Sequence, residues 1–143
     1  MKILLIAPLF SLLLFGCAKM TVDGPFEPQT ILLQSSSATV TQAGAVTLNA
    51  NVLFDNGAWC CQDAKVEFYK GDALIGTDST ATAITPQLPN QGPSFSYEQT
   101  LQFVGSPDNG TNSYIAVVVF NSAKDNTVKS ISSSPVSIVI NIQ

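Results

Sequence analysis

Two adjacent cysteines, Cys60 and Cys61, are the residues with the clearest capacity for chemistry, and the single tryptophan, Trp59, precedes them. Adjacent Cα atoms lie about 3.8 Å apart across a trans peptide, whereas an ordinary disulfide needs about 4.4–6.8 Å. A Cys60–Cys61 ring would therefore be strained and easily reduced. The alternatives are two thiols buried beside Trp59, or cross-links to a second chain. A redox enzyme is disfavoured, because the pair is not C-x-x-C and nothing nearby would lower a thiol pKa.

Acidic residues supply the second kind of candidate chemistry. Several oxygen-bearing side chains stand in expected loops near one end of the fold, namely Asp55, Asn56, Asp63, Asp125 and Asn126. Such ligands suit Ca²⁺, but no D-x-[DN]-x-[DN]-G series is present and Asp-Asn-Gly is also ordinary turn chemistry, so calcium is the weaker interpretation. Two acid pairs lack a glycosidase signature and are interpreted as solvated carboxylates: Asp63 with Glu67, and Asp72 with Asp78.

Composition argues against several classes of function. The chain has 143 residues, with ten acidic residues, six basic residues and no histidine. All the basic residues are lysines, so a chain of net negative charge is a poor candidate for binding nucleic acid, where phosphate neutralisation dominates. The missing histidine removes the Ser-His-Asp and Cys-His nucleophile systems and the His-based zinc sites. We therefore expect no enzymatic activity, no cofactor and no nucleic-acid partner.

The N-terminal segment positions the third cysteine, Cys17. After Lys2 comes an apolar stretch, residues 3–15, which as a helix would rise only about 20 Å and is too short for a bilayer core of about 30 Å. We therefore predict a cleaved signal peptide. Its end, Leu14-Phe15-Gly16-Cys17, resembles the bacterial lipobox, although Phe15 stands where a small or β-branched residue is usual.

The lipobox resemblance implies a bacterial lipoprotein in which residues 1–16 are removed and Cys17 is diacylated. Two acyl chains are also the physical minimum for stable anchoring. The alternative is an ordinary secretory signal with a chance cysteine. Because Ala18 is not the Asp that retains many lipoproteins at the inner membrane, the resemblance favours the outer membrane of the cell envelope. The expected partners are the membrane, through the lipid on Cys17, and another envelope protein.

After the signal, the apolar pattern has a period of two. Residues 17–28 are expected to form a lipidated tether, and residues 29–143 are the size of one domain. Five apolar stripes alternate with polar residues: Val46 to Val52, Val66 and Phe68, Phe95 to Phe103, Tyr114 to Phe120, and Val136 to Ile142. Each stripe is typical of one buried face of a strand. Turn residues stand between the stripes, so we predict an all-β fold, a single antiparallel β-sandwich of about seven strands.

Three segments resemble the bacterial Ig-like repeat. They read VEFYKGDALIGTD at 66–78, NGTNSYIA at 109–116 and SSPVSIVI at 133–140. The resemblance covers nearly everything from Ile31 to Ile142 and implies an Ig-like or fibronectin-type sandwich with adhesive or spacer roles and no catalytic residue. Two stretches depart from the family pattern: residues 56–64, which hold Trp59 and the cysteine pair, and residues 79–94, which are longer and richer in proline.

Two structural residues are expected where residues 109–116 enter their strand. Tyr114 follows a turn, which is the position of a tyrosine corner whose hydroxyl bonds back to the backbone. Gly110 is expected to have a positive φ. The predicted function is a non-catalytic, lipid-anchored envelope protein serving as an adhesive, scaffold or protein-interaction module. The alternative is a small-ligand or calcium-binding module using the loops around Trp59, with a redox role of the cysteine pair as its weakest form.

Alternate connections of a sandwich fall at opposite ends, which places a candidate partner surface. Residues 56–64, 79–94 and 123–126 should share one end with the tether. Trp59, Gln62 and Gln91 are therefore the candidate partner-binding residues, because aromatic anchors are favoured at recognition sites. The alternative is that Trp59 folds inward and plugs the end of the sandwich.

Overall fold

A computed structural model describes residues 27–54, 64–84, 92–122 and 125–143. Several candidate residues lie outside these ranges, and the hypotheses on them stay predictions: Cys17, Asp55, Trp59, Cys60, Cys61, Gln62, Asp63 and Gln91. The described part contains no α-helix, and its one short 3₁₀ helix is η1 (Ser106–Asp108).

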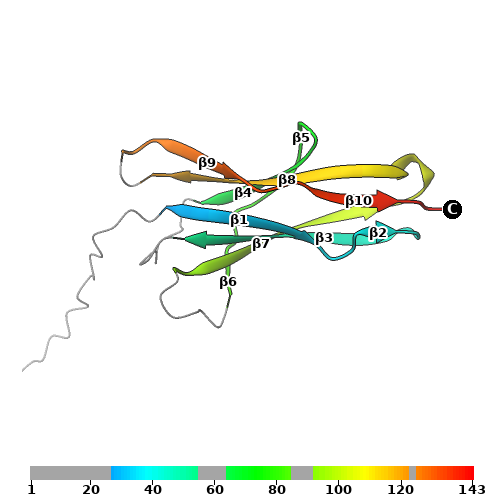
Figure 1. The fold of residues 1–143 in the computed structure, drawn as a ribbon, viewed down its shortest axis with the longest axis horizontal. Helices are drawn as coiled ribbons and strands as arrows, with labels where there is room; N and C mark the ends of the chain where they lie inside the picture. The colour runs from blue at the N-terminus through cyan, green and yellow to red at the C-terminus, as the bar shows by residue number, and fades with distance from the viewer. Residues whose placement is uncertain (1–26, 55–63, 85–91, 123–124) are drawn as a thin grey trace, which may run out of the picture.

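Two β-sheets stacked face to face make up the fold (Figure 1). The first sheet has the order β1-β3-β7-β6, comprising β1 (Pro28–Ser35), β3 (Gly44–Phe54), β7 (Ser94–Phe103) and β6 (Thr82–Ala83). The second has the order β2-β10-β8-β4-β5, comprising β2 (Thr39–Val40), β10 (Val136–Ile140), β8 (Gly110–Asn121), β4 (Lys65–Lys70) and β5 (Ala73–Asp78). A further strand, β9 (Val128–Ser132), also pairs with β8. All pairings are antiparallel except β2 with β10.

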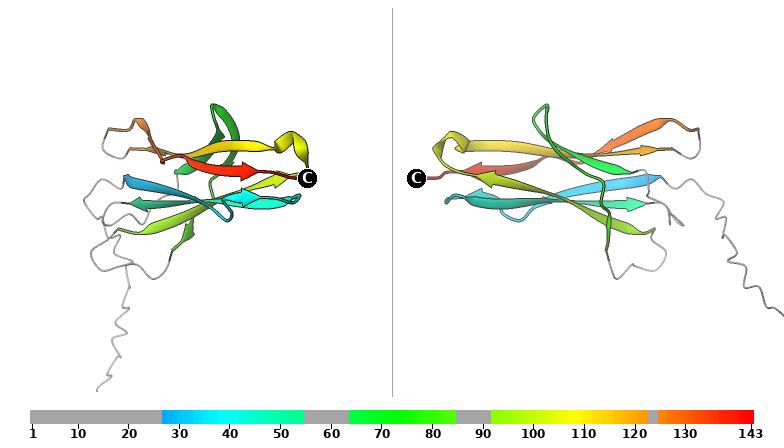
Figure 2. Two further views of the ribbon diagram at one scale, coloured as in Figure 1. Left: turned by 45° about the vertical axis from the view of Figure 1, so that its right-hand side comes forward. Right: turned by 180° about the vertical axis from the view of Figure 1, so that it is seen from behind.

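The all-β sandwich expected from the alternating pattern is confirmed. In immunoglobulin-type sandwiches the first, second and fifth strands share one sheet while the third, sixth and seventh share the other. The observed sheet orders follow that scheme, and the two layers are distinct in both views of Figure 2.

The expected number of about seven strands is too low, since the described residues form ten. The first strand divides because the chain leaves the first sheet after Ser35 and joins the edge of the second sheet as β2. Within the expected link of residues 79–94, Thr82 and Ala83 pair with β7 as β6. The last strand divides into β9 and β10. The three additional strands are β2, β6 and β9. Each is short or interrupted, lies at a sheet edge and carries no apolar stripe of its own.

A β-bulge separates β9 from β10. From Ser132 to Val136 the chain advances four residues, whereas their partners Val117 and Tyr114 on β8 are only three apart. The extra residue reverses which side chains face the core, because successive side chains on a strand point to opposite faces. Inside the bulge, Ser133 bonds twice to Ala116: its backbone N–H donates to the Ala116 carbonyl at 2.8 Å, and its hydroxyl accepts from the Ala116 N–H at 3.0 Å.

The core lies between the sheets and follows the predicted parity. On β8, alternate residues are buried from Tyr114 to Phe120, and Val118 has no exposed surface. The stripes on β3 and β4 are buried in the same way, and Ile138, Ile140 and Ile142 continue the core to the C-terminus. Near the opposite end of the sandwich, Phe54 and Phe95 stack edge to face with ring centroids 5.6 Å apart. Burial of these stripes supplies the main driving force for folding.

Candidate functional site

A cluster of polar side chains joins the start of the domain to the connection between β8 and β9. We call Glu27, Ser122, Asp125 and Lys129 the tether clasp. The Ser122 hydroxyl donates a short hydrogen bond to Glu27 Oε1. Lys129 Nζ lies 3.4 Å from the same oxygen and 3.2 Å from Asp125 Oδ2. The end of the expected tether is therefore held to residues 95 and 102 positions further along the sequence.

Charge and hydrogen bonding reinforce one another within the clasp. The Ser122 hydroxyl, and then Lys129, hold the pKa of the Glu27 carboxyl below its ordinary value. Hydrogen bonds from Thr127, and then Lys129, hold the pKa of Asp125 well below its usual range. Asp125 and Glu27 in turn raise the pKa of Lys129. All three groups are thus ionised at neutral pH, and the single ammonium bridges the two carboxylates.

The bulge explains why Lys129 can reach Glu27. Lys129 has the parity of Ile131, which packs against the core, and its neighbour Val128 is 70% exposed. Had β9 continued the parity of β10, Val128 would face inward and Lys129 would face solvent. A bulge re-aims side chains in this way, and here it directs a lysine toward the end of the tether.

The described flanks of three connections meet at the same end of the sandwich. Pro28 pairs with Phe54, and the Phe54 N–H donates to the Pro93 carbonyl at 3.0 Å. The ends of β1, β3, β7, β8 and β9 that lie on the left in Figure 1 therefore meet at the end of the sandwich where β1 begins. The expectation that residues 56–64, 79–94 and 123–126 share an end with the tether stays a prediction for the parts outside the described residues, whose described flanks lie together here. Trp59, Gln62 and Gln91 belong to connections that leave from and return to this end.

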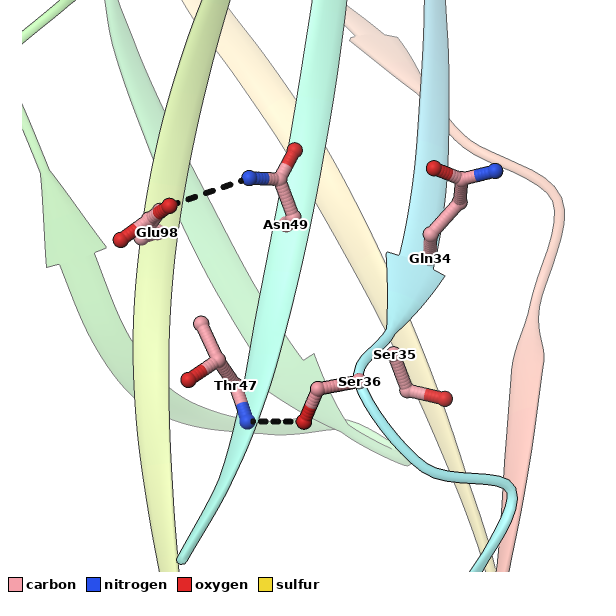
Figure 3. Close-up of a pocket in the computed structure, with 6 residues that line it drawn as sticks. All are labelled: Gln34, Ser35, Ser36, Thr47, Asn49 and Glu98. Carbon is pink, nitrogen blue, oxygen red and sulfur yellow. Dashed lines mark hydrogen bonds between the residues drawn. The ribbon is translucent and has the colours of Figure 1, made fainter.

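A shallow hollow of about 400 Å³ lies on the outer face of the first sheet (Figure 3). Its lining is polar and comes from β1, β3 and β7 and the residue after β1: Gln34, Ser35, Ser36, Thr47, Asn49 and Glu98. Asn49 Nδ2 donates to Glu98 Oε1 at 3.2 Å and to Ser96 Oγ at 2.8 Å. The Thr47 N–H donates to Ser36 Oγ at 3.0 Å. These groups largely bond to one another, as is typical of a solvated sheet face.

Two of the acidic residues considered for metal binding or acid–base chemistry, Asp125 and Glu67, have other partners. Asp125, the one acidic calcium candidate within the described ranges, accepts from the N–H and hydroxyl of Thr127 as well as pairing with Lys129. Glu67 pairs with Lys65 at 2.7 Å and accepts from the Tyr69 hydroxyl at 2.6 Å. Across residues 27–54, 64–84, 92–122 and 125–143, no group of three His, Cys, Asp or Glu side chains could hold a metal ion.

Asp78 has a structural task of its own. One carboxylate oxygen accepts from the Thr80 N–H at 2.8 Å, and the other accepts from the Glu98 N–H on β7, also at 2.8 Å. The side chain therefore joins the chain that leaves the second sheet to the edge of the first. Asp78, interpreted from the sequence as a solvated carboxylate, is thus half-buried and bonded to two backbone N–H groups.

The two expected structural residues lie at the other end of β8. Gly110 has a φ of +130°, a region that favours glycine. Tyr114 is 2% exposed, and burial, together with the charge of Asp108, raises the pKa of its hydroxyl. Within the described part of the chain, no hydrogen bond joins this hydroxyl to the backbone, so the tyrosine corner stays a prediction. Nearby, Asn109 bonds through its side chain to both backbone groups of Ile142, at 2.7 and 3.0 Å.

Comparison with protein-family models and with curated proteins finds no match to this chain. Within the described ranges, no helix has the length and apolar character needed to cross a membrane. The clasp residues Glu27, Ser122 and Lys129 were not among the candidate residues suggested by the sequence. The sequence signal that could have indicated the bulge, and with it the direction of Lys129, was Pro135, because a proline beside a strand marks an edge or a bulge.

Proposed function

We propose that this chain is a non-catalytic, lipid-anchored envelope protein whose Ig-like domain serves as an adhesive or protein-interaction module. The observation that carries the proposal is the tether clasp. Glu27 lies at the end of the proposed tether, and its contacts with Ser122 and Lys129 tie the base of the tether to the end of the sandwich. Such an attachment suits a domain that must stand in a defined direction from a membrane.

The N-terminal sequence supports the same proposal. A lysine, an apolar stretch and the Leu14-Phe15-Gly16-Cys17 motif precede a segment with two prolines. Acylation of Cys17 would place the membrane at most about 35 Å from the clasp, because ten or so extended residues span 3.3–3.6 Å each. The loops at the clasp end would then face the anchoring membrane, and the opposite end, near Gly110, would face away from it.

The anchor is tested by replacing Cys17 in the full chain and following detergent partition and N-terminal mass. The unaltered protein should partition into detergent and carry acyl chains on Cys17. Cys17→Ser should stay in the aqueous phase or remain unprocessed, whereas the matched control Cys60→Ser should partition like the unaltered protein. A mature N-terminus at Ala18 or later, with no lipid mass, would contradict the proposal.

A further inference from the structure

One edge of β9 has no strand beside it in the described part of the structure. The Ser122 N–H donates to the Thr127 carbonyl at one end of the β8–β9 pair, and the Ser133 N–H donates to the Ala116 carbonyl at the other. Backbone groups alternate in direction along a strand. The odd-numbered residues of β9 therefore bond to β8, and the N–H and C=O groups of Val128, Ser130 and Ser132 point away from the sheet.

The edge is open at β9 because of how the first strand divides. In β10, the outward groups are covered by β2: the Val139 N–H donates to the Ala38 carbonyl at 3.0 Å, and the Asn141 N–H donates to the Val40 carbonyl at 2.8 Å. No part of the first strand pairs with β9 in the way that β2 pairs with β10, because residues 28–35 belong to the opposite sheet as β1. Among the described residues, the last strand is thus covered by a further strand over β10 and not over β9.

The side chains of β9 do little to guard this edge. Natural sheet edges are commonly protected by lysine, proline or an inward-pointing charge. The only charged residue of β9 is Lys129, which is an inward-pointing charge of this kind. Its ammonium is already paired with Glu27 and Asp125 in the clasp, so a strand added at the edge would not leave the charge unpaired. The remaining outward side chains are Val128, which is 70% exposed, and the small hydroxyls of Ser130 and Ser132. The edge is therefore suited to receive another strand.

We propose that the edge of β9 pairs with the same edge of a second copy of this chain. The argument for this occupant is register. An antiparallel pair with its two-fold axis at Ser130 places Ser130 opposite Ser130, and Val128 opposite Ser132. All three are residues whose backbone groups point outward, so about six hydrogen bonds form, two for each pair. Lys129 then stands opposite Ile131, so no like charges face each other directly across the new pair.

The pairing would give the proposed adhesive function a partner, namely a second copy of the chain. Its location between membranes rests on the proposed lipid anchor. Glu27 and Lys129 are in contact, so each tether leaves from the end at which β9 begins. In an antiparallel pair these two ends point in opposite directions. Two upright copies on one membrane could not pair in this way, whereas copies on facing membranes could. The contact joins only five residues from each copy, so single pairs are weak and a dense layer would act through multivalency.

The pairing itself is tested in detergent solution, where the anchor is not needed for the readout. The chain carries Cys60→Ser and Cys61→Ser, and one further cysteine is introduced at Ser130. Paired residues of this kind have Cα atoms about 5.5 Å apart, within the range of a disulfide. Ser130→Cys should give a covalent dimer on mild oxidation. The matched control Ser96→Cys, on the outer face of the other sheet, should give roughly tenfold less. Equal cross-linking at both positions, or none at Ser130, would overturn the proposal.

The location between membranes is tested with vesicles bearing the full lipidated chain. Vesicles bearing the unaltered chain should cluster. Ser130→Pro removes an outward N–H without removing a bond to β8 and should abolish clustering, while Ser130→Thr should retain it. Separate vesicles carrying Ser130→Lys and Ser130→Glu should cluster only when mixed. Cross-linking at Ser130 without vesicle binding would disprove the anchor alone, whereas bound vesicles that stay dispersed would disprove pairing between membranes.

Discussion

At the residue scale, Gly76 shows how one missing side chain lets the two sheets approach. A Cβ built on Gly76 would lie 1.7 Å from Gln99 Oε1 and 2.4 Å from Gln99 Cδ. Gly76 is on β5 and Gln99 is on β7, so the contact joins an edge strand of one sheet to the other sheet. Gly76 also stands in the L-I-G-T segment that resembles the Ig-like repeat. The glycine is therefore explained by the space that Gln99 occupies.

The first prediction follows from this contact. Gly76→Ala should lower the free energy of unfolding by about 1 kcal/mol, because the overlap is with the end of a flexible side chain that can move away. Gln99→Ala removes the obstacle. The free energy of unfolding of the double variant should therefore be close to that of Gln99→Ala alone. Urea unfolding of the four proteins measures the coupling. Effects that simply add would show that the alanine is accommodated without displacing Gln99.

At the scale of elements, alternation predicted the core because strand side chains repeat every two residues. Val118, Ile138 and the other members of the stripes are buried as the pattern indicates. The bulge was not predicted, because one extra residue between two half-strands leaves each half with a normal pattern. Ile131 is the only large apolar residue of β9 that packs against the core, and one residue cannot define a parity.

The second prediction tests the parity of β8. Val118→Asp should prevent stable folding, because an unpaired carboxylate without solvent costs several kcal/mol and a domain this size has only about 5–15 kcal/mol to lose. Val119→Asp is the matched control, since Val119 is on the other face and pairs with Lys65. It should change the free energy of unfolding by less than about 1 kcal/mol. Circular dichroism during heating measures both. Similar melting of the two variants would mean that the parity of this strand is wrong.

At the scale of the whole molecule, the clasp joins the start of the domain to the distant connection between β8 and β9. Glu27 and Lys129 are separated by 102 positions in the sequence. No local pattern could have predicted their contact, because it depends on the sheet order and on the bulge that turns Lys129 inward. The common end of the loops and tether, by contrast, could be predicted from strand alternation alone. The sequence thus predicted which strand ends share one end of the sandwich but not the contacts that hold Glu27 there.

The last prediction concerns the pH dependence of the clasp. The Ser122 hydroxyl, and then Lys129, lower the pKa of Glu27 from its ordinary value of 4.5. A group with a lowered pKa in the folded state stabilises that state above its unfolded pKa, and the stabilisation is lost as pH falls through the folded pKa. The melting temperature should therefore be higher for the unaltered protein than for Glu27→Gln at pH 5–7. As the pH falls below 4.5, the two melting temperatures should approach each other, because the carboxyl of the folded protein becomes protonated.

Two controls separate the clasp from the general effect of acid. Asp72→Asn removes an exposed carboxylate from the turn between β4 and β5, outside the clasp, and should not reproduce the pH-dependent difference. Lys129→Gln should lower the melting temperature at pH 7, and adding Glu27→Gln to it should then have a smaller effect, because the two side chains share one contact. Salt should narrow the difference at pH 7, since exposed ion pairs are screened. A difference between the unaltered protein and Glu27→Gln that is constant from pH 7 to pH 3 would show that the Glu27 charge does not hold the tether.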